Sequence, residues 1–98
     1  MKTLRIMVVC GFGLGSSMIL KMTLDEVLQE NHLKAETFCS DAETARGQDF
    51  NLVLTSAELV SLFSESVKPV VVISDFLSRA EVAAKALPII HELMRLDS

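Results

Sequence analysis

The 98-residue sequence has no tryptophan and no tyrosine, and five phenylalanines are its only large aromatic side chains. Aromatic platforms on which sugars or nucleic-acid bases stack are therefore nearly absent. The net charge is −4, and no block of lysine and arginine interrupts it. Because binding to a nucleic-acid backbone needs a basic surface, we expect no nucleic-acid partner.

Cysteine and histidine are also scarce, with two residues of each type. Cys10 and Cys39 do not form a C-x-x-C pair, and His32 and His91 are isolated in the sequence. A zinc site needs ligands at close, regular spacing, so we expect no metal ion and no cofactor.

Long apolar runs are missing as well. No charge-free stretch approaches the roughly 18 residues of a membrane span. The first apolar run, Ile6 to Cys10, lies between Lys2 and Arg5 on one side and a glycine on the other, and is too short for a secretory signal. With only two cysteines, we expect a reducing, cytoplasmic setting without direct membrane insertion. The length predicts a single domain, residues 1–98.

Four short apolar runs predict β-strands, namely Leu4–Cys10, Ala35–Cys39, Phe50–Leu54 and Pro69–Ile73. Their apolar residues are continuous rather than alternating with polar ones. This pattern is typical of strands covered on both faces, and hence of a parallel sheet.

The segments between the strands have helical patterns. An apolar stripe after the first strand predicts a helix through Leu20, Leu24, Val27 and Leu28. A second stripe predicts a C-terminal helix, in which Pro88 should cause a kink or a break. Three capping boxes, a hydroxyl followed three residues later by a carboxylate, predict helix starts at Ser40–Glu43, Thr55–Glu58 and Ser78–Glu81.

This order predicts an α/β fold, β-α-β-α-β-α-β-α, with a small open four-stranded parallel sheet flanked by helices. It is a Rossmann-like architecture with a phosphate loop like that of low-molecular-weight phosphatases. Ligands of such sheets bind outside the carboxyl ends of the strands. Those ends carry Cys10, Ser40, Thr55 with Ser56, and Ser74 with Asp75.

Cys10 stands where the first apolar run meets a glycine-rich turn with glycines at 11, 13 and 15, followed by two serines. Backbone N–H groups of such a loop and the positive end of the following helix form a cradle for a phosphate dianion. The same field stabilises a thiolate, which is the nucleophilic form of cysteine. The plainer interpretation is that Cys10 is a small buried residue of the strand. Its position beside three glycines disfavours this interpretation.

Other candidates have plainer explanations. Ser16 and Ser17 are candidate helix caps, which is compatible with phosphate contact. Cys39 is expected to pack in the core, and Asp75 is expected to be structural rather than a general acid. Met18 and Met22 are expected to fill the core. The sequence leaves open the alternative that they form a surface patch for a partner protein.

The loop lacks the cation that phosphate hydrolysis needs. Cysteine phosphatases place an arginine after a five-residue loop, where its guanidinium clamps the transferring group. Counted from Cys10, that position is Ser16, and no lysine or arginine lies between Cys10 and Ser17. Such a loop suits a carrier that shields its phosphoryl group from water.

The segment Val9–Met22, with its C-G-x-G-x-G-S-S-M pattern, closely resembles the active-site loop of IIB components of the sugar phosphotransferase system (PTS), and most of all the ascorbate-type branch. The resemblance implies that Cys10 accepts a phosphoryl group from a histidine of a IIA protein and passes it to a substrate, such as L-ascorbate, bound by a membrane IIC permease. It implies a phosphate-binding loop made of Gly11, Phe12, Gly13, Leu14, Gly15, Ser16 and Ser17.

Three alternative functions remain open when the residues alone are considered. One is a low-molecular-weight cysteine phosphatase with Cys10 as nucleophile and Asp75-Phe76 as an acid loop. Another is a redox module that uses Cys10 and Cys39. The third is a stand-alone regulatory domain of the same fold.

Overall fold

The computed structural model describes residues 3–9, 14–45, 47–64 and 66–97. Its elements follow one another in the order β1 (Leu4–Val9), α1 (Leu14–Glu30), β2 (Ala35–Ser40), α2 (Ala42–Ala45), β3 (Leu52–Thr55), a 3-10 helix η1 (Val60–Phe63), β4 (Val70–Val72) and α3 (Arg79–Asp97). Each predicted strand is confirmed. β1 and β2 begin at the predicted residues, the other described bounds differ by one or two residues, and the predicted end of the first strand, Cys10, lies outside the described residues.

The four strands form one parallel sheet in the order β2-β1-β3-β4. This confirms the predicted α/β class with an open, four-stranded parallel sheet. β1 lies inside the sheet, and its last residue, Val9, pairs with Ser40 of β2 and Thr55 of β3. The carboxyl ends of these three strands therefore lie side by side.

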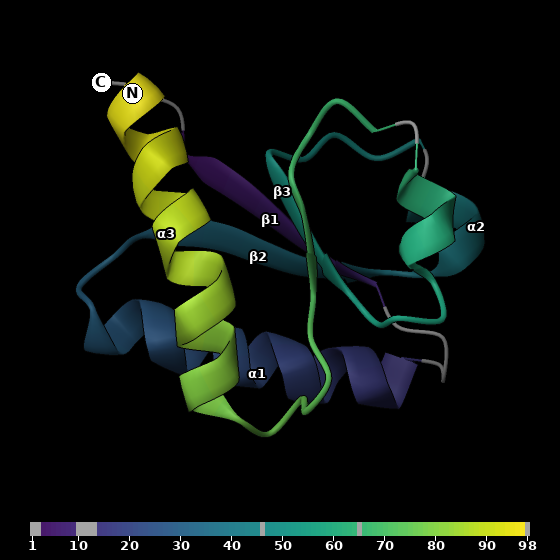
Figure 1. Cartoon of the computed structure of the whole chain (residues 1–98), viewed down its shortest axis with the longest axis horizontal. Coiled ribbons are helices and arrows are strands. Elements are labelled where there is room, and N and C mark those ends of the chain that lie inside the picture. The colour runs from purple at the N-terminus through teal and green to yellow at the C-terminus, as the bar shows by residue number, and fades with distance from the viewer. Residues whose placement is uncertain (1–2, 10–13, 46, 65, 98) are drawn as a thin grey trace.

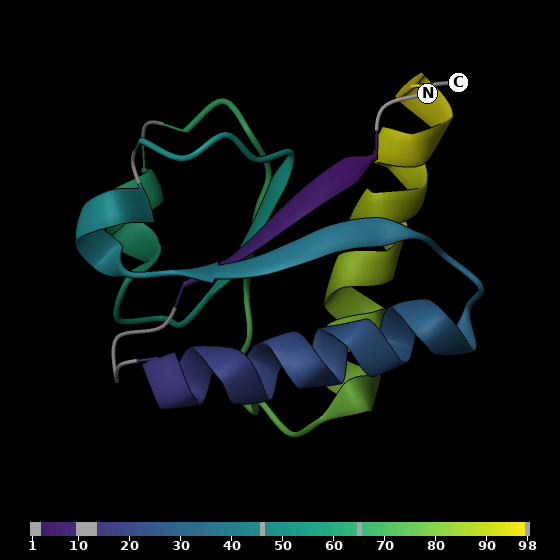
Figure 2. The same ribbon diagram turned by 180° about the vertical axis from the view of Figure 1, so that it is seen from behind.

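The helices cover the two faces of the sheet unequally, as Figures 1 and 2 show from opposite sides. The long helices α1 and α3 pack on one face, where Leu24 and Ile90 join the strand residues Ile6, Val8 and Leu54 in a buried cluster. We call this the first face. The other face, which we call the second face, is covered by α2 and η1.

On the second face, the short elements pack against the alternate residues of the strands. Met7, Val9 and Val53 lie in a smaller buried cluster with Phe50 and Phe63. The rings of Phe50 and Phe63 meet edge to face, 6.3 Å between their centroids. The strands are thus buried on both sides, as their continuous apolar sequences predicted.

The prediction of an α-helix after the third strand is wrong, because the described residues of that segment form a 3-10 helix, Val60–Phe63. The carbonyl of Thr55 accepts a hydrogen bond of 2.9 Å from the Ile73 N–H. Thr55 is the last residue of β3, and within the described residues its hydroxyl oxygen has no hydrogen-bond partner. It therefore does not act as a helix N-cap, which would accept a backbone N–H with that oxygen.

The other two capping boxes also differ from the prediction. One helix is capped by the next residue along the chain, and the other box forms one of its two expected hydrogen bonds. Asp41, not Ser40, caps α2, since its Oδ1 accepts the Thr44 N–H at 2.7 Å. Ser78 caps α3 through a 3.1 Å hydrogen bond from the Glu81 N–H to its hydroxyl oxygen. The Glu81 carboxylate, however, bonds to residues before Ser78 rather than to Ser78 itself.

Pro88 does not break the last helix, which continues through it from Arg79 to Asp97. Proline removes the donor for the carbonyl of Ala84, four residues earlier. Both Ala84 and Pro88 are on the exposed side of α3, where water can reach that carbonyl.

Two residues after the end of helix α1 at Glu30, a histidine adopts a left-handed backbone conformation. His32 has φ of 56°, and the His32 and Leu33 N–H groups bond to the carbonyls of Gln29 and Leu28. This is the Schellman arrangement that glycine usually completes. It turns the chain back toward β2.

Candidate functional site

The boundary between the neighbouring strands β1 and β3 is the point of this sheet at which the crossovers change sides. The chain leaves β1 through α1 on the first face, and it leaves β3 through η1 on the second face. In open α/β sheets the ligand binds at such a switch point, outside the carboxyl ends of the strands. At this point the last described residue of β1, Val9, pairs with Thr55, the last residue of β3.

The sequence-predicted loop follows β1 in the chain and runs into α1, next to this switch point. Cys10, Gly11, Phe12 and Gly13 lie outside the described residues, so the structure does not place the candidate nucleophile. The remaining loop candidates, Leu14, Gly15, Ser16 and Ser17, form the first turn of α1. The helix therefore begins about one turn earlier in the chain than the sequence predicted.

The first turn of α1 provides a positive electrostatic end. No acidic residue lies in that turn, so no side-chain negative charge there opposes the positive end of the helix dipole. Ser16 is half-buried and Ser17 is 1% exposed. An anion at the end of β1 would meet backbone donors rather than a guanidinium or ammonium group of the loop.

Thr55 and Ser56, at the end of β3, were expected on this edge from the sequence. Both are buried, with exposures of 0% and 4%. Within the part of the chain that the structure describes, neither hydroxyl oxygen has a hydrogen-bond partner. Buried hydroxyl groups are rarely left unpaired.

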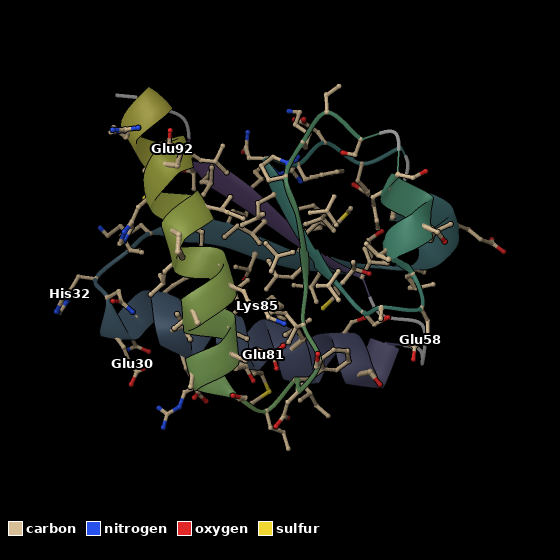
Figure 3. The ribbon with its side chains drawn as sticks, viewed as in Figure 1. Glu30, His32, Glu58, Glu81, Lys85 and Glu92 are labelled. Atoms are coloured by element: carbon tan, nitrogen blue, oxygen red, sulfur yellow. The ribbon has the colours of Figure 1, made fainter. Side chains whose placement is uncertain are left out.

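The loop from β4 to α3 is fixed at the same edge by Glu81. Its carboxylate accepts hydrogen bonds from the N–H groups of Ser74 (2.7 Å) and Asp75 (2.9 Å), and Lys85 Nζ lies 2.7 Å away. The Lys85 hydrogen bond, followed by the two backbone bonds, lowers the pKa of Glu81 to about 2. Figure 3 labels Glu81 and Lys85 on α3.

Asp75 has a turn-forming contact, since its Oδ1 accepts the Leu77 N–H at 3.0 Å. This agrees with the structural role expected for it. The sequence did not reveal that Glu81 bonds back to residues 74 and 75, because a capping box predicts only a bond to the cap residue itself.

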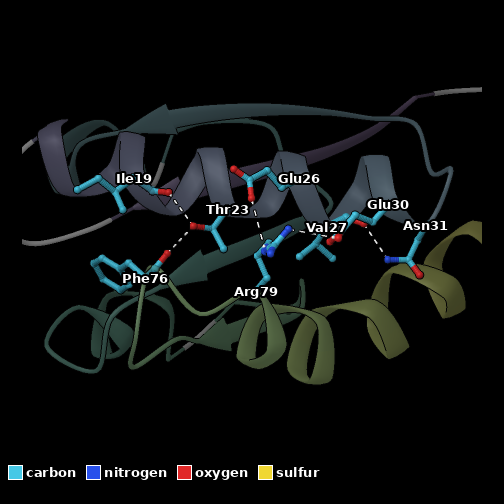
Figure 4. Close-up of polar contacts among 8 residues, drawn as sticks. All are labelled: Ile19, Thr23, Glu26, Val27, Glu30, Asn31, Phe76 and Arg79. Carbon is cyan, nitrogen blue, oxygen red and sulfur yellow. Dashed lines mark hydrogen bonds and ion pairs between the residues drawn. The ribbon is translucent and has the colours of Figure 1, made fainter.

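Helix α1 is also tied to the β4–α3 loop (Figure 4). The buried Thr23 hydroxyl lies 2.6 Å from the Phe76 carbonyl oxygen and 3.1 Å from that of Ile19. Nearby, Arg79 pairs with Glu30 at 3.3 Å and Glu26 at 3.7 Å. These contacts hold the start of α3 against α1.

The second cysteine, Cys39, is half-buried on the edge strand β2 and pairs with Val8. Burial raises the pKa of its thiol, an effect that Lys21 partly opposes. At neutral pH this thiol is therefore mostly protonated and a weak nucleophile. Its partial exposure makes it less of a core residue than the sequence suggested.

The expectation that Met18 and Met22 fill the core is wrong. Their exposures are 54% and 59%, and Ile19 and Leu77 are exposed as well. Spacing of four residues places the two methionines on one face of α1 but does not say which face. They are offset by two residues from Leu20 and Leu24, and so they point away from the buried stripe.

A pocket of about 640 Å³ lies on the second face, away from the carboxyl edge. Phe50 and Lys68, which precede β3 and β4, line it together with Phe63. It is thus near the amino ends of these strands, opposite the switch point.

Residues 3–9, 14–45, 47–64 and 66–97 contain neither a metal-binding cluster of side chains nor a helix that could span a membrane. No group of three or more His, Cys, Asp and Glu side chains in these ranges is arranged to hold a metal ion. No helix in them is both long and apolar enough to span a membrane.

Comparison with known families supports the sequence resemblance. Residues 5–86 match the family described as "PTS system, Lactose/Cellobiose specific IIB subunit". The chain belongs to the PTS IIB family. Two relatives, named ascorbate-specific PTS system EIIB components of Salmonella choleraesuis and Salmonella typhimurium, are each 32% identical over 93 residues, covering 92% of both chains.

The fold is also that of a solved IIB structure. The lactose-specific IIB component domain of Streptococcus pneumoniae superposes with a TM-score of 0.62, covering 93% of this chain and 97% of that one. The sequence identity is 14%, so this likeness concerns the fold alone. Family membership gives the chain a general phosphotransferase role, and IIB components work with IIA and IIC proteins.

Proposed function

We propose that this PTS IIB protein carries a phosphoryl group on Cys10, with Gly11, Phe12, Gly13, Leu14, Gly15, Ser16 and Ser17 as its phosphate-binding loop. The observation that supports this most is the place of the loop in a IIB fold. It joins β1 to the N-terminus of α1 at the topological switch point. The first turn of α1 supplies donors there without an acidic residue.

Two transfers make up the proposed cycle. In the first, a lone pair of the Cys10 thiolate forms an S–P bond, and the P–N bond of a IIA phosphohistidine breaks with its electron pair returning to the imidazole. In the second, a substrate hydroxyl oxygen forms the new P–O bond, and the sulfur leaves as thiolate. The hydroxyl proton passes to a base on the side of the IIC permease.

The proposed substrate is L-ascorbate, because the two Salmonella relatives are named ascorbate-specific and match nearly the whole chain. The proposed partners are accordingly a IIA phosphodonor and a IIC permease. We further propose that residues 1–98 form one IIB domain that acts in the cytoplasm.

The test is incubation with a radiolabelled phospho-IIA protein of an ascorbate system. A carrier takes up about one cysteine-linked phosphoryl group per chain and releases little free phosphate. Continuous release of phosphate without retained label would instead indicate a cysteine phosphatase. Replacing the donor with a lactose-type phospho-IIA should give slower labelling if the ascorbate assignment is right.

A further inference from the structure

Four large apolar side chains lie exposed on helix α1 and on the loop that connects β4 to α3. Their exposures are 54% for Met18, 44% for Ile19, 59% for Met22 and 76% for Leu77. We call these four side chains the apolar patch. Within the described residues none of them belongs to a buried core cluster, so packing of the fold does not explain them. Contiguous apolar surface of this kind is typical of a docking site, and methionine adapts well to a partner surface.

The helix and loop parts of the apolar patch are held side by side. The Thr23 hydroxyl, one helical turn after Ile19, donates to the carbonyl of Phe76 at 2.6 Å (Figure 4). Leu77 follows Phe76 directly, and its N–H is fixed by a 3.0 Å bond to Asp75 Oδ1. The apolar patch is therefore one surface, on the half of α1 that is nearest the carboxyl edge of the sheet.

The same edge of the sheet has exposed carboxylates. The segments that follow the neighbouring strands β3 and β4, residues 56–59 and 73–78, contain the exposed Glu58 and Asp75 and no lysine or arginine. The cations in the adjoining parts of α1 and α3 are paired with carboxylates: Lys21 with Asp25, Arg79 with Glu26 and Glu30, and Lys85 with Glu81. Charge complementarity therefore favours a partner whose apolar docking site has a basic rim.

We infer that the apolar patch, with the carboxylates Glu58 and Asp75 of the same edge, docks on the cytoplasmic side of the IIC permease. Cytoplasmic loops of membrane proteins have an excess of lysine and arginine, which matches these carboxylates. Anionic lipid headgroups would instead be repelled by them. The inference rests on the proposed function for the choice of partner, and it adds the surface that the permease contacts.

The test is sedimentation of the unphosphorylated protein with inside-out membrane vesicles, prepared with and without an ascorbate-type IIC permease. Met22→Gln and Leu77→Gln make the apolar patch more polar with little change of volume, and Glu58→Lys reverses a charge. The matched controls lie before β4 and β3, at the amino ends of the strands. They are Val67→Gln, at a 94% exposed apolar position, and Asp49→Lys, at a side chain that is 86% exposed.

We expect the wild-type protein to bind the vesicles that contain IIC, and to bind them more weakly as the salt concentration rises, because exposed charges are screened. Met22→Gln, Leu77→Gln and Glu58→Lys should each weaken this binding by about fivefold or more. Val67→Gln and Asp49→Lys should bind as wild type. The rate of labelling by phospho-IIA, measured beside the binding, should stay near the wild-type rate in every variant.

Wild-type binding by Met22→Gln, Leu77→Gln and Glu58→Lys would overturn the inference, and so would a wild-type protein that does not bind the IIC vesicles. Slower labelling by phospho-IIA with unchanged vesicle binding would assign the apolar patch to the IIA donor instead. Equal binding to vesicles without IIC would assign it to the lipid surface. Each of these results leaves the proposed function intact, whereas failure of the wild-type protein to take up label from phospho-IIA would refute that function itself.

Discussion

At the scale of single residues, the two cysteines hold different positions relative to the helices and strands. Cys39 lies in a half-buried position of the edge strand, where desolvation raises its thiol pKa. Cys10 follows Val9 directly and precedes the positive end of α1, without an acidic residue in the first turn of that helix. A helix N-terminus favours the thiolate, so the two thiols should differ in reactivity.

We therefore predict that Cys10 has a thiol pKa below the usual value of about 8.5 and reacts faster than Cys39 at neutral pH. The measurement is the rate of alkylation against pH, with Cys10→Ser and Cys39→Ser used to assign each rate. If Cys39 were the faster thiol at pH 7, the assignment of the site to Cys10 would be wrong.

The residue types of the carboxyl edge were predictable, but their hydrogen bonding was not. The strand ends already placed Ser40, Thr55, Ser56 and Ser74 on that edge. Whether a hydroxyl is buried and unpaired depends on packing from segments distant in the sequence, such as the strands on either side of β3. Local patterns of hydroxyl and carboxylate contain no such information.

At the scale of elements, the β4–α3 loop depends on one carboxylate. Glu81 accepts the N–H groups of Ser74 and Asp75 and pairs with Lys85, which together lower its pKa to about 2. A carboxyl whose pKa is lower in the folded than in the unfolded protein stabilises the fold above its unfolded value, here 4.5. That contribution is lost as the pH falls from about 4.5 through 2.

We expect Glu81→Gln to melt below wild type at pH 7, because an amide is a weaker acceptor for two N–H groups and lacks the charge that pairs with Lys85. The difference should shrink as the pH is lowered from 4.5 toward 2. Glu92→Gln, on the exposed side of the same helix, is the control and should change little. A difference that stays constant over this range would contradict the role given to Glu81.

At the scale of the whole molecule, the sheet has one well-covered face and one thinly covered face. The apolar stripes of α1 and α3 were evident from their helical spacing, and both helices form as predicted. The short elements of the second face gave no such stripe. At the end of β3, the Thr55 carbonyl stays bonded to the Ile73 N–H of the neighbouring strand's end, and a 3-10 helix follows where the sequence predicted an α-helix.

The first face should therefore dominate stability. We predict that Leu24→Ala, at a fully buried position of α1, lowers the free energy of unfolding by about 2–5 kcal/mol. Met22→Ala, two residues away and 59% exposed, should change it by less than about 0.5 kcal/mol. Chemical denaturation measures both, and equal losses would mean that α1 is rotated relative to the structure.

The central claim is that Cys10 holds the phosphoryl group between a IIA donor and the substrate. Its most direct test is transfer of radiolabel from phospho-IIA to wild type, Cys10→Ser and Cys39→Ser, with the labelled residue located by peptide mass spectrometry. We predict label on Cys10 in wild type and in Cys39→Ser, and none in Cys10→Ser, because a serine hydroxyl without a base is too weak a nucleophile. Labelling of Cys10→Ser at the wild-type rate would contradict the account.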